Sequence, residues 1–252
     1  MSTNRLAIIT GATSGIGFAI AKRLGKDGFT VVLNGIEHEE GAKKVESLIA
    51  KGIDAEYCGF DVTQEEQVTA NLTKIGEKYG KIDVLVNNAG GLGGRSRFEE
   101  MTTDFYRSVM ALNLDSVFFA SRAAIPFLKQ GDRPTIINFT SNAAWNAGGP
   151  GAGIYGTSKA GVHTITRALA KDLAEYGIRV NAVSPGTIDT PFHQQIKSTK
   201  PEVFASWANN IMLGRLGQPK DVAGVVAFLA SRDACFITAE TIQIGGGQAL
   251  GI

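Results

Sequence analysis

The chain has 252 residues, of which 44% are hydrophobic and 19% charged, the balance of a globular protein with a sizeable core. A formal net charge of +1 gives no general attraction to nucleic acid or to an anionic membrane. No apolar run is long enough to span a bilayer, and the N-terminal stretch lacks the apolar region of a signal peptide. The two cysteines, Cys58 and Cys235, are far apart and outside any Cys/His cluster, so we expect a reducing, cytoplasmic setting and no metal site.

Apolar, strand-like runs alternate with helical patterns along the whole chain. The strand-like runs are 5–10, 30–34, 54–60, 82–88, 135–140, 178–184 and 241–245. The helical patterns are 15–27, 39–51, 64–79, 102–129, 153–176 and 219–231. Near-continuous β-branched runs are typical of parallel strands that are buried on both faces. The pattern predicts one α/β domain over residues 1–252, a doubly wound Rossmann-type fold with a seven-stranded, mainly parallel sheet.

The least regular stretch is 186–214, which follows the sixth strand-like run. Ligands of doubly wound sheets bind at the carboxyl ends of the strands. A long insertion at such a strand end commonly serves as a lid. We therefore expect this segment to be a substrate loop.

The sequence TGATSGIG follows the first strand-like run, with glycines at 11, 15 and 17 and with Ser14 and Ile16 between them. Glycines at such a turn let the backbone approach a pyrophosphate, and the next helix then directs its free N–H groups at the anion. A glycine cluster alone is also compatible with a plain tight turn. Its position between the first strand and the first helix favours a dinucleotide site.

The end of the second strand-like run bears on the choice of cofactor. A carboxylate there would bind the ribose hydroxyls, and an arginine would accept a 2′-phosphate. The chain has Asn34, Gly35 and Ile36 at this point, followed by three glutamates within 37–40. Because these carboxylates would repel a phosphate, we favour NAD(H), with NADP(H) as the alternative. The glutamates could equally be the solvated first turn of a helix.

Tyr155 and Lys159 are four residues apart near the start of a predicted helix, so they share one helix face. Beside a nicotinamide site the pair has a chemical use, because carbonyl reduction needs a proton donor and alcohol oxidation needs a base. A phenol with an ordinary pKa of about 10 is a weak acid, and a nearby ammonium would lower its pKa. Ser141, at the end of the fifth strand-like run, would donate a hydrogen bond to the substrate oxygen.

Together these motifs resemble those of the short-chain dehydrogenase/reductase family, in its compact single-domain form, from Leu6 to about Gly247. The matching pieces are TGATSGIG (10–17), Asp61–Val62, NNAG (87–90), Asn113, Ser141, Tyr155 with Lys159, and Pro185–Gly186 with Thr190. The sequence departs from the family pattern in two respects. The interval from Ser141 to Tyr155 is one residue longer than is common, and Gly245 stands where the family often has aspartate.

The resemblance implies a role for each matching residue. Tyr155 would be the general acid/base, Lys159 would also hold the nicotinamide ribose, Ser141 would polarise the carbonyl, and Asn113 would anchor a water in a proton relay. Asp61 and Val62 would hold the adenine, and the segment with Asn88, Ala89 and Gly90 would line the cofactor. Ile188 and Thr190 would contact its carboxamide and phosphates, and Pro185 and Gly186 would also belong to the cofactor site. The family's use of the long helices and the last strand for assembly implies a homotetramer.

The loops near the predicted site contain the candidate substrate residues. Arg95 and Arg97 follow the NNAG turn, Asn142 and Trp145 follow Ser141, and His193 lies in the substrate loop. Arginine binds carboxylates with two hydrogen bonds, so a cationic corner would suit a hydroxylated substrate with a carboxylate. The family resemblance then suggests enzymes of sugar-acid breakdown, including reductases of the unsaturated-uronate product of alginate. The arginines could equally be solvated or serve subunit contacts.

Two other functions remain open on the sequence. The first is an NADPH-dependent 3-oxoacyl-thioester reductase, which would want a basic residue near 14 or 36, where this chain has Ser14 and Ile36. The second is a non-catalytic dinucleotide sensor or scaffold. Such proteins often lack a catalytic residue, and here Asn113, Ser141, Tyr155 and Lys159 are all present.

Overall fold

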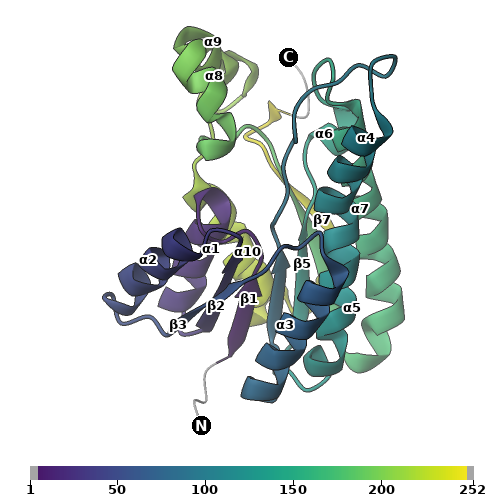
Figure 1. Cartoon of the computed structure of the whole chain (residues 1–252). Coiled ribbons are helices and arrows are strands. Elements are labelled where there is room, and N and C mark those ends of the chain that lie inside the picture. Colours follow the sequence, from purple (N-terminus) through teal and green to yellow (C-terminus); the bar gives the residue numbers. More distant parts are fainter. Residues whose placement is uncertain (1–4, 249–252) are drawn as a thin grey trace.

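The computed structural model describes residues 5–248, and its centre is a seven-stranded sheet in the order β3-β2-β1-β4-β5-β6-β7. The strands are β1 (Leu6–Ile9), β2 (Thr30–Gly35), β3 (Ala55–Gly59), β4 (Val84–Asn87), β5 (Thr135–Phe139), β6 (Arg179–Pro185) and β7 (Thr241–Ile244). All neighbouring strands pair in parallel, so the sheet is wholly rather than mainly parallel. The predicted doubly wound α/β fold is confirmed, and Figure 1 shows helices on both sides of the sheet.

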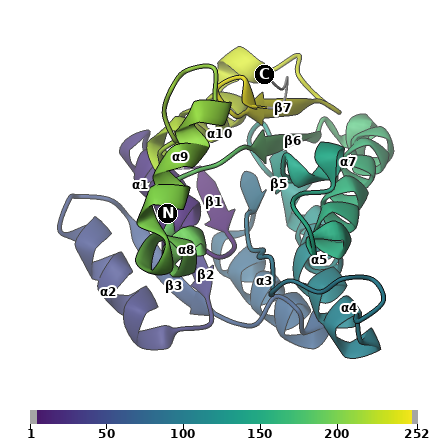
Figure 2. The same cartoon turned by 90° about the horizontal axis from the view of Figure 1, so that it is seen from above.

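Helices cover both faces of the sheet. On one face lie α1 (Gly15–Lys26), α2 (His38–Ile49) and α10 (Pro219–Ala230), and on the other lie α3 (Glu65–Tyr79), α5 (Ser116–Leu128) and α7 (Gly153–Leu173). The view from above shows the two groups on either side of the sheet (Figure 2). Each face has its own apolar core, because alternate residues of the buried strands point to opposite sides: Ile9 and Leu33 pack with α1 and α10, and Ile8 and Val32 with α3 and α5.

The helix predicted over 102–129 is interrupted. It consists of α4 (Thr103–Met110), a π-helical turn at Ala111–Asp115, and then α5. Asn113 lies inside the π turn, and its side-chain amide donates to the carbonyls of Val109 (2.9 Å) and Gly91 (2.8 Å). The side chain thus bonds both its own helix and the loop after β4. Single π-helical turns inside helices are frequent at functional sites.

The predicted substrate loop is more regular than expected. It contains a short turn at Pro191–His193, α8 (Gln194–Thr199), α9 (Pro201–Ser206) and a further turn at Trp207–Asn210. These helices project beyond the carboxyl end of the sheet (Figure 1). The side chain of His193 packs edge to face against Phe192 and Trp207 and lies tilted against Phe204. The segment is therefore a small helical unit with its own aromatic contacts.

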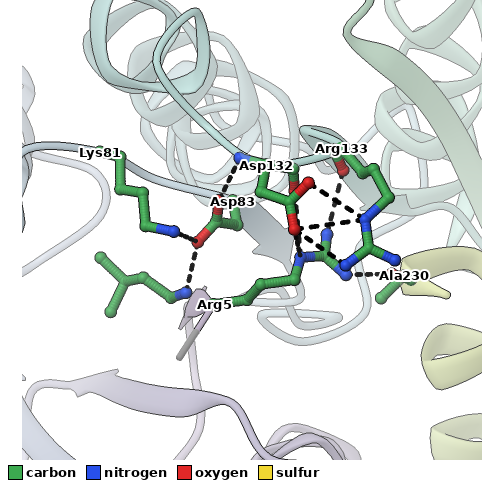
Figure 3. Close-up of polar contacts among 7 residues, drawn as sticks. Arg5, Lys81, Asp83, Asp132, Arg133 and Ala230 are labelled. Atoms are coloured by element: carbon green, nitrogen blue, oxygen red, sulfur yellow. Dashed lines mark hydrogen bonds and ion pairs between the residues drawn. The ribbon is translucent and has the colours of Figure 1, made fainter. Parts of the chain in front are cut away.

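A charged cluster lies at the amino ends of the central strands (Figure 3). The buried carboxylate of Asp83 accepts from the backbone N–H groups of Leu6 (2.6 Å) and Asp132 (2.5 Å) and pairs with Lys81 (3.1 Å). Arg5 donates to the carbonyls of Asp132, Arg133 and Ala230. A buried carboxylate is tolerated only when it is paired and hydrogen-bonded, as Asp83 is. The cluster joins the starts of β1 and β4 to the end of α10, at the end of the strands opposite to the predicted site.

Candidate active site

The glycine-rich turn between β1 and α1 is tightly packed. Gly11 has φ +61°, and a Cβ on Gly17 would lie 2.3 Å from the carbonyl oxygen of Gly11. The side chain of Asn88 donates to the carbonyls of Thr10 (2.8 Å) and Gly11 (2.9 Å) and so ties this turn to the end of β4. Ser14 precedes α1 without a side-chain capping bond among the described residues, so the first N–H groups of α1 are open to an anion. The turn therefore fits a pyrophosphate.

Ser141, Tyr155 and Lys159 line one cavity of about 560 Å³ together with the glycine-rich turn. Ser141 follows β5, and its Oγ accepts from the N–H of Ala143 (3.2 Å). Tyr155 and Lys159 lie in the first turns of α7, with the lysine Nζ 5.9 Å from the centre of the tyrosine ring. The Nζ of Lys159 is buried and donates to the carbonyl of Phe139 (2.9 Å). A hydroxyl, a phenol and an amine thus meet at the carboxyl ends of the central strands.

Burial dominates the acid–base properties of this group. It raises the pKa of Tyr155, while the hydrogen bond with Ser141 lowers it. Burial also lowers the pKa of Lys159 from 10.5 to about 8. Desolvation of the phenolate is the larger effect, so the pKa of Tyr155 lies above its ordinary value, and the expected lowering of this pKa by Lys159 stays a prediction. At neutral pH Tyr155 is a protonated acid.

Asn113 and Gly90 hold the loop that faces Lys159. The Oδ1 of Asn113 accepts from the N–H of Gly91 (3.0 Å), so its side chain is fully engaged with this loop and the π turn. A Cβ on Gly90 would lie 2.8 Å from the Oδ1 of Asn113 and 2.9 Å from the Nζ of Lys159. Only glycine fits at this position without displacing both groups. The space beside Gly90 is part of the same cavity.

The structure brings most of the predicted site residues to this cavity. Those that line it are Gly11, Ser14, Gly15, Ile16, Gly17, Asn88, Gly90, Ser141, Asn142, Tyr155, Lys159, Pro185, Gly186, Ile188, Thr190 and His193. Those that lie outside its lining are Asn34, Gly35, Ile36, Asp61, Val62, Ala89, Arg95, Arg97, Asn113 and Trp145. Most of the predicted cofactor residues in the second group lie near the carboxyl ends of β2 and β3, where the adenosine end of a dinucleotide would bind.

Asn34 is part of the fold rather than a free ligand for a ribose. Its Oδ1 accepts from the N–H of Gly11 (3.3 Å), and its Nδ2 donates to the carbonyls of Cys58 (3.3 Å) and Phe60 (2.9 Å). The side chain is only 1% exposed. Asp61 is also engaged, since its Oδ1 accepts from the N–H (2.9 Å) and hydroxyl (2.8 Å) of Thr63. The side chain of Asn34 therefore holds the glycine-rich turn against the end of β3, and its predicted contact with the cofactor stays a prediction.

The predicted substrate residues divide in a similar way. Asn142 and His193 line the cavity, whereas Trp145 packs edge to face on His163 at 5.0 Å, outside its lining. Arg95 is exposed, and its Nη1 donates to the carbonyl of Pro150 (2.8 Å), beside the cavity-lining Gly149. Arg97, two residues further along the same loop, is exposed and does not line the cavity. The structure therefore places Arg95 at the rim of the cavity.

Several cavity residues were absent from the sequence prediction, among them Thr187, Phe192 and Gln248. Gln248 follows β7 and reaches the cavity through a turn in which Gly246 and Gly247 have positive φ. The run GGGQ at 245–248 was the available signal, since consecutive glycines after a strand mark a sharp change of chain direction. Nothing in the sequence indicated where this turn would lead.

A glycine-rich turn before α1 and a serine, tyrosine and lysine at the adjacent strand ends define a dinucleotide-dependent oxidoreductase. A family model described as enoyl-(acyl carrier protein) reductase matches residues 11–249. The chain therefore belongs to the short-chain dehydrogenase/reductase family, and it acts on CH–OH or C=O groups with NAD(P)(H) as acceptor or donor.

Among its relatives, the 3-oxoacyl-(acyl-carrier-protein) reductase of Thermotoga maritima is 36% identical over 98% of both chains. A solved NADH-dependent reductase responsible for alginate metabolism is 36% identical, with a TM-score of 0.87 over 97% of both chains. A gluconate 5-dehydrogenase from Burkholderia cenocepacia, solved with NADP and tartrate, is 30% identical, with a TM-score of 0.91 over 98% of this chain and 96% of the other.

Proposed function

We propose that this chain is an NAD(H)-dependent oxidoreductase that interconverts a carbonyl and a secondary alcohol on a polar keto-sugar acid. The observation that supports this reaction is the shared cavity, in which Ser141, Tyr155 and Lys159 lie beside the glycine-rich turn. A bound nicotinamide supplies hydride to the carbonyl carbon or removes it from the alcohol carbon. The side chains of the cavity then supply the hydrogen bond and the proton at the substrate oxygen.

The three side chains have distinct roles at the substrate oxygen. Ser141 donates a hydrogen bond that strengthens as negative charge develops there. Tyr155 then gives its proton to that oxygen, and its burial keeps it protonated for this step. Lys159, with a pKa of about 8, is mostly an ammonium at neutral pH and opposes the negative charge left on the phenol. Alcohol oxidation uses the same groups in reverse.

The preference for NAD(H) is supported by the surface after β2. Ile36 is 69% exposed, and Glu37 stands directly before α2. The first lysines or arginines that follow β2 in the chain are Lys43 and Lys44, and Lys44 pairs with Glu40 at 2.7 Å. A 2′-phosphate would therefore meet carboxylates and an apolar side chain before any free cation. A basic group at 14 or 36, which would accept that phosphate, is replaced by Ser14 and Ile36.

A polar substrate is supported by the substrate half of the cavity. Its wall includes the amides of Asn142, Asn146 and Gln248 and the ring of His193, with the cation of Arg95 at the rim beyond Gly149. Amides can bond sugar hydroxyls, and a guanidinium can bind a carboxylate. The names of two relatives, a reductase of alginate metabolism and a gluconate 5-dehydrogenase, agree with this substrate class.

The alternative is an NADPH-dependent 3-oxoacyl-thioester reductase, favoured by the equally similar Thermotoga maritima enzyme. Initial rates of NADH and NADPH oxidation with keto-sugar acids, 3-oxoacyl thioesters and simple ketones separate the two. We expect the highest kcat/KM with NADH and a keto-sugar acid. A strong preference for NADPH and an acyl thioester would replace the proposal with the alternative.

The carboxylate contact has its own test in Arg95→Ala. We expect KM for a keto-sugar acid to rise about tenfold, because an arginine–carboxylate pair is lost, while a neutral ketone keeps its KM. Arg97→Ala, two residues away on the exposed side of the loop, is the matched comparison and should have the smaller effect. Equal KM values for wild type and Arg95→Ala with the acid substrate would rule out the rim contact.

A further inference from the structure

The chain segment after β7 turns back over the carboxyl ends of β5 and β6. Gly246 (φ +59°) and Gly247 (φ +89°) form the turn, and the N–H of Leu213 donates to the carbonyl of Gly246 (3.1 Å). Leu213 lies at the end of the substrate loop and Thr187 at its start. The turn therefore contacts one end of that loop through its backbone and the other through Gln248.

The side chain of Gln248 makes three hydrogen bonds to the residues that follow β5 and β6. Its Oε1 accepts from the backbone N–H of Thr187 (2.8 Å) and from the Nδ2 of Asn142 (3.3 Å), and its Nε2 donates to the hydroxyl of Thr187 (2.9 Å). Asn142 follows Ser141 directly, and its own N–H donates to the carbonyl of Pro185 (3.2 Å). One side chain thus joins the ends of three neighbouring strands.

The backbone N–H of Thr187 can only donate, so it fixes which end of the Gln248 amide faces it. The Oε1 also faces the Asn142 amide and can accept only from its Nδ2, so the Nδ2 of Asn142 is turned toward it. The Oδ1 of Asn142 is left buried and without a partner among residues 5–248. An unpaired buried acceptor is unfavourable by about 1–3 kcal/mol, so Asn142 does not adopt this orientation for its own hydrogen bonding. Gln248 imposes it.

The packing around Gln248 leaves no room for a side chain at position 186. A Cβ on Gly186 would lie 2.6 Å from the Oε1 of Gln248 and 3.0 Å from the Nδ2 of Asn142. Gln248 also lines the cavity that holds Ser141, Tyr155 and His193. A change in its side chain therefore reaches the substrate half of the site through Thr187 and Asn142, with no contact to the reacting groups required.

We propose that Gln248 is a positioning residue, which fixes the start of the substrate loop at Thr187 and the amide of Asn142 beside Ser141, and so sets the geometry in which the carbonyl substrate binds. This proposal rests on the proposed function of the same cavity. It assigns to the turn after the last strand a part in substrate recognition, in addition to ending the sheet.

Three variants test the proposal. Gln248→Met keeps the length of the side chain but removes every hydrogen bond. Gln248→Glu keeps an acceptor for the N–H of Thr187 and for Asn142, and the Thr187 hydroxyl can turn to donate to it. Gln130→Met is the matched control, at an exposed glutamine beyond α5 at the other end of the molecule.

The first measurement is hydrogen exchange at the Thr187 amide, which is independent of any substrate. We expect exchange at least about tenfold faster in Gln248→Met, and near wild-type exchange in Gln248→Glu and Gln130→Met. Unchanged protection of this amide in Gln248→Met would overturn the proposal, because the bridge would not then be what holds the loop.

The second measurement is steady-state kinetics with the best carbonyl substrate. Gln248→Met should raise the substrate KM about tenfold, with kcat and the cofactor Kd within about threefold of wild type, and Gln248→Glu should restore the KM. An equal loss in both variants, in proportion to a lower thermal midpoint, would show a merely structural role and overturn the proposal. A wild-type enzyme that reduces no carbonyl would instead refute the proposed function, and the exchange measurement would still decide whether Gln248 holds Thr187.

Discussion

At the scale of single residues, a polar side chain near a strand end can belong to the site or to the fold. Asn34 and Asn142 look alike in sequence, since each lies where a strand ends near the cofactor turn. The side chain of Asn34 is hydrogen-bonded to the backbone of Gly11, Cys58 and Phe60, whereas Asn142 lines the cavity. The difference is set by the neighbouring strand, because the carbonyls of Cys58 in β3 and of Phe60 just after it both accept from the side-chain amide of Asn34.

Asn34→Asp tests this assignment. A carboxylate would lose both donors to Cys58 and Phe60 and would face their carbonyl oxygens in a buried place. We expect a loss of about 2–4 kcal/mol in the free energy of unfolding, measured by urea denaturation. Tighter NADH binding with unchanged stability would show instead that residue 34 faces the ribose.

Lys159→Met tests the burial of the lysine. A folded-state pKa of about 8, below the ordinary 10.5, means that the folded protein disfavours the ammonium by about 3 kcal/mol below pH 8. This cost falls as pH rises from 8 to 10.5, because the lysine in the folded protein is then neutral, and it vanishes above 10.5. We therefore expect the unfolding free energy of wild type relative to Lys159→Met to rise across this window. A difference that is flat between pH 7 and 11 would contradict the depressed pKa.

At the scale of elements, the strand–turn–helix unit β1–α1 forms the phosphate side of the site. Gly17→Ala should abolish dinucleotide binding, since its Cβ would lie 2.3 Å from the Gly11 carbonyl and force the turn apart. Gly224→Ala in α10 is the control, because its Cβ would meet only the end of Arg23 at 3.8 Å and alanine favours a helix. Fluorescence titration with NADH measures both, and retained affinity in Gly17→Ala would contradict the packing of this turn.

Periodicity predicted every strand and every long helix of the fold, because strands buried on both faces and amphipathic helices leave clear patterns. It missed the π turn at 111–115, since the bonds of Asn113 to Gly91 are tertiary and leave no trace in local periodicity. The short helices at 194–199 and 201–206 were also missed. They hold together partly through the aromatic contacts of His193, which bring residues more than ten positions apart into contact.

At the scale of the whole molecule, the sequence predicted the glycine-rich turn, the Ser141, Tyr155 and Lys159 group and part of the cavity wall, namely Asn142 and His193, but not the rest of that wall. Ser141, Tyr155 and Lys159 were predictable because their chemistry and spacing are distinctive. Gln248 was not, because its place depends on a turn over two other strands. None of the helices within residues 5–248 is long and apolar enough to cross a membrane.

Assembly also belongs to this scale. We propose a homotetramer, supported by exposed aromatic residues on or near the elements that the family resemblance implies for assembly: Phe118 on α5, and Phe236, which is fully exposed just before β7. Sedimentation should give a mass near four times 26.6 kDa, and Phe118→Asp should lower it by placing a charge in an apolar contact. Ile36→Asp, on a different surface, should leave the mass unchanged. A wild-type monomer would contradict this assembly.

The central claim is that Tyr155 transfers the proton at the substrate oxygen. Tyr155→Phe removes only the hydroxyl, and the ring can keep its packing on α7. With the best keto substrate and NADH, stopped-flow measurement should show the hydride-transfer rate reduced by about 10²–10⁴, with the Kd for NADH little changed. A hydride-transfer rate within a few-fold of wild type would contradict the account.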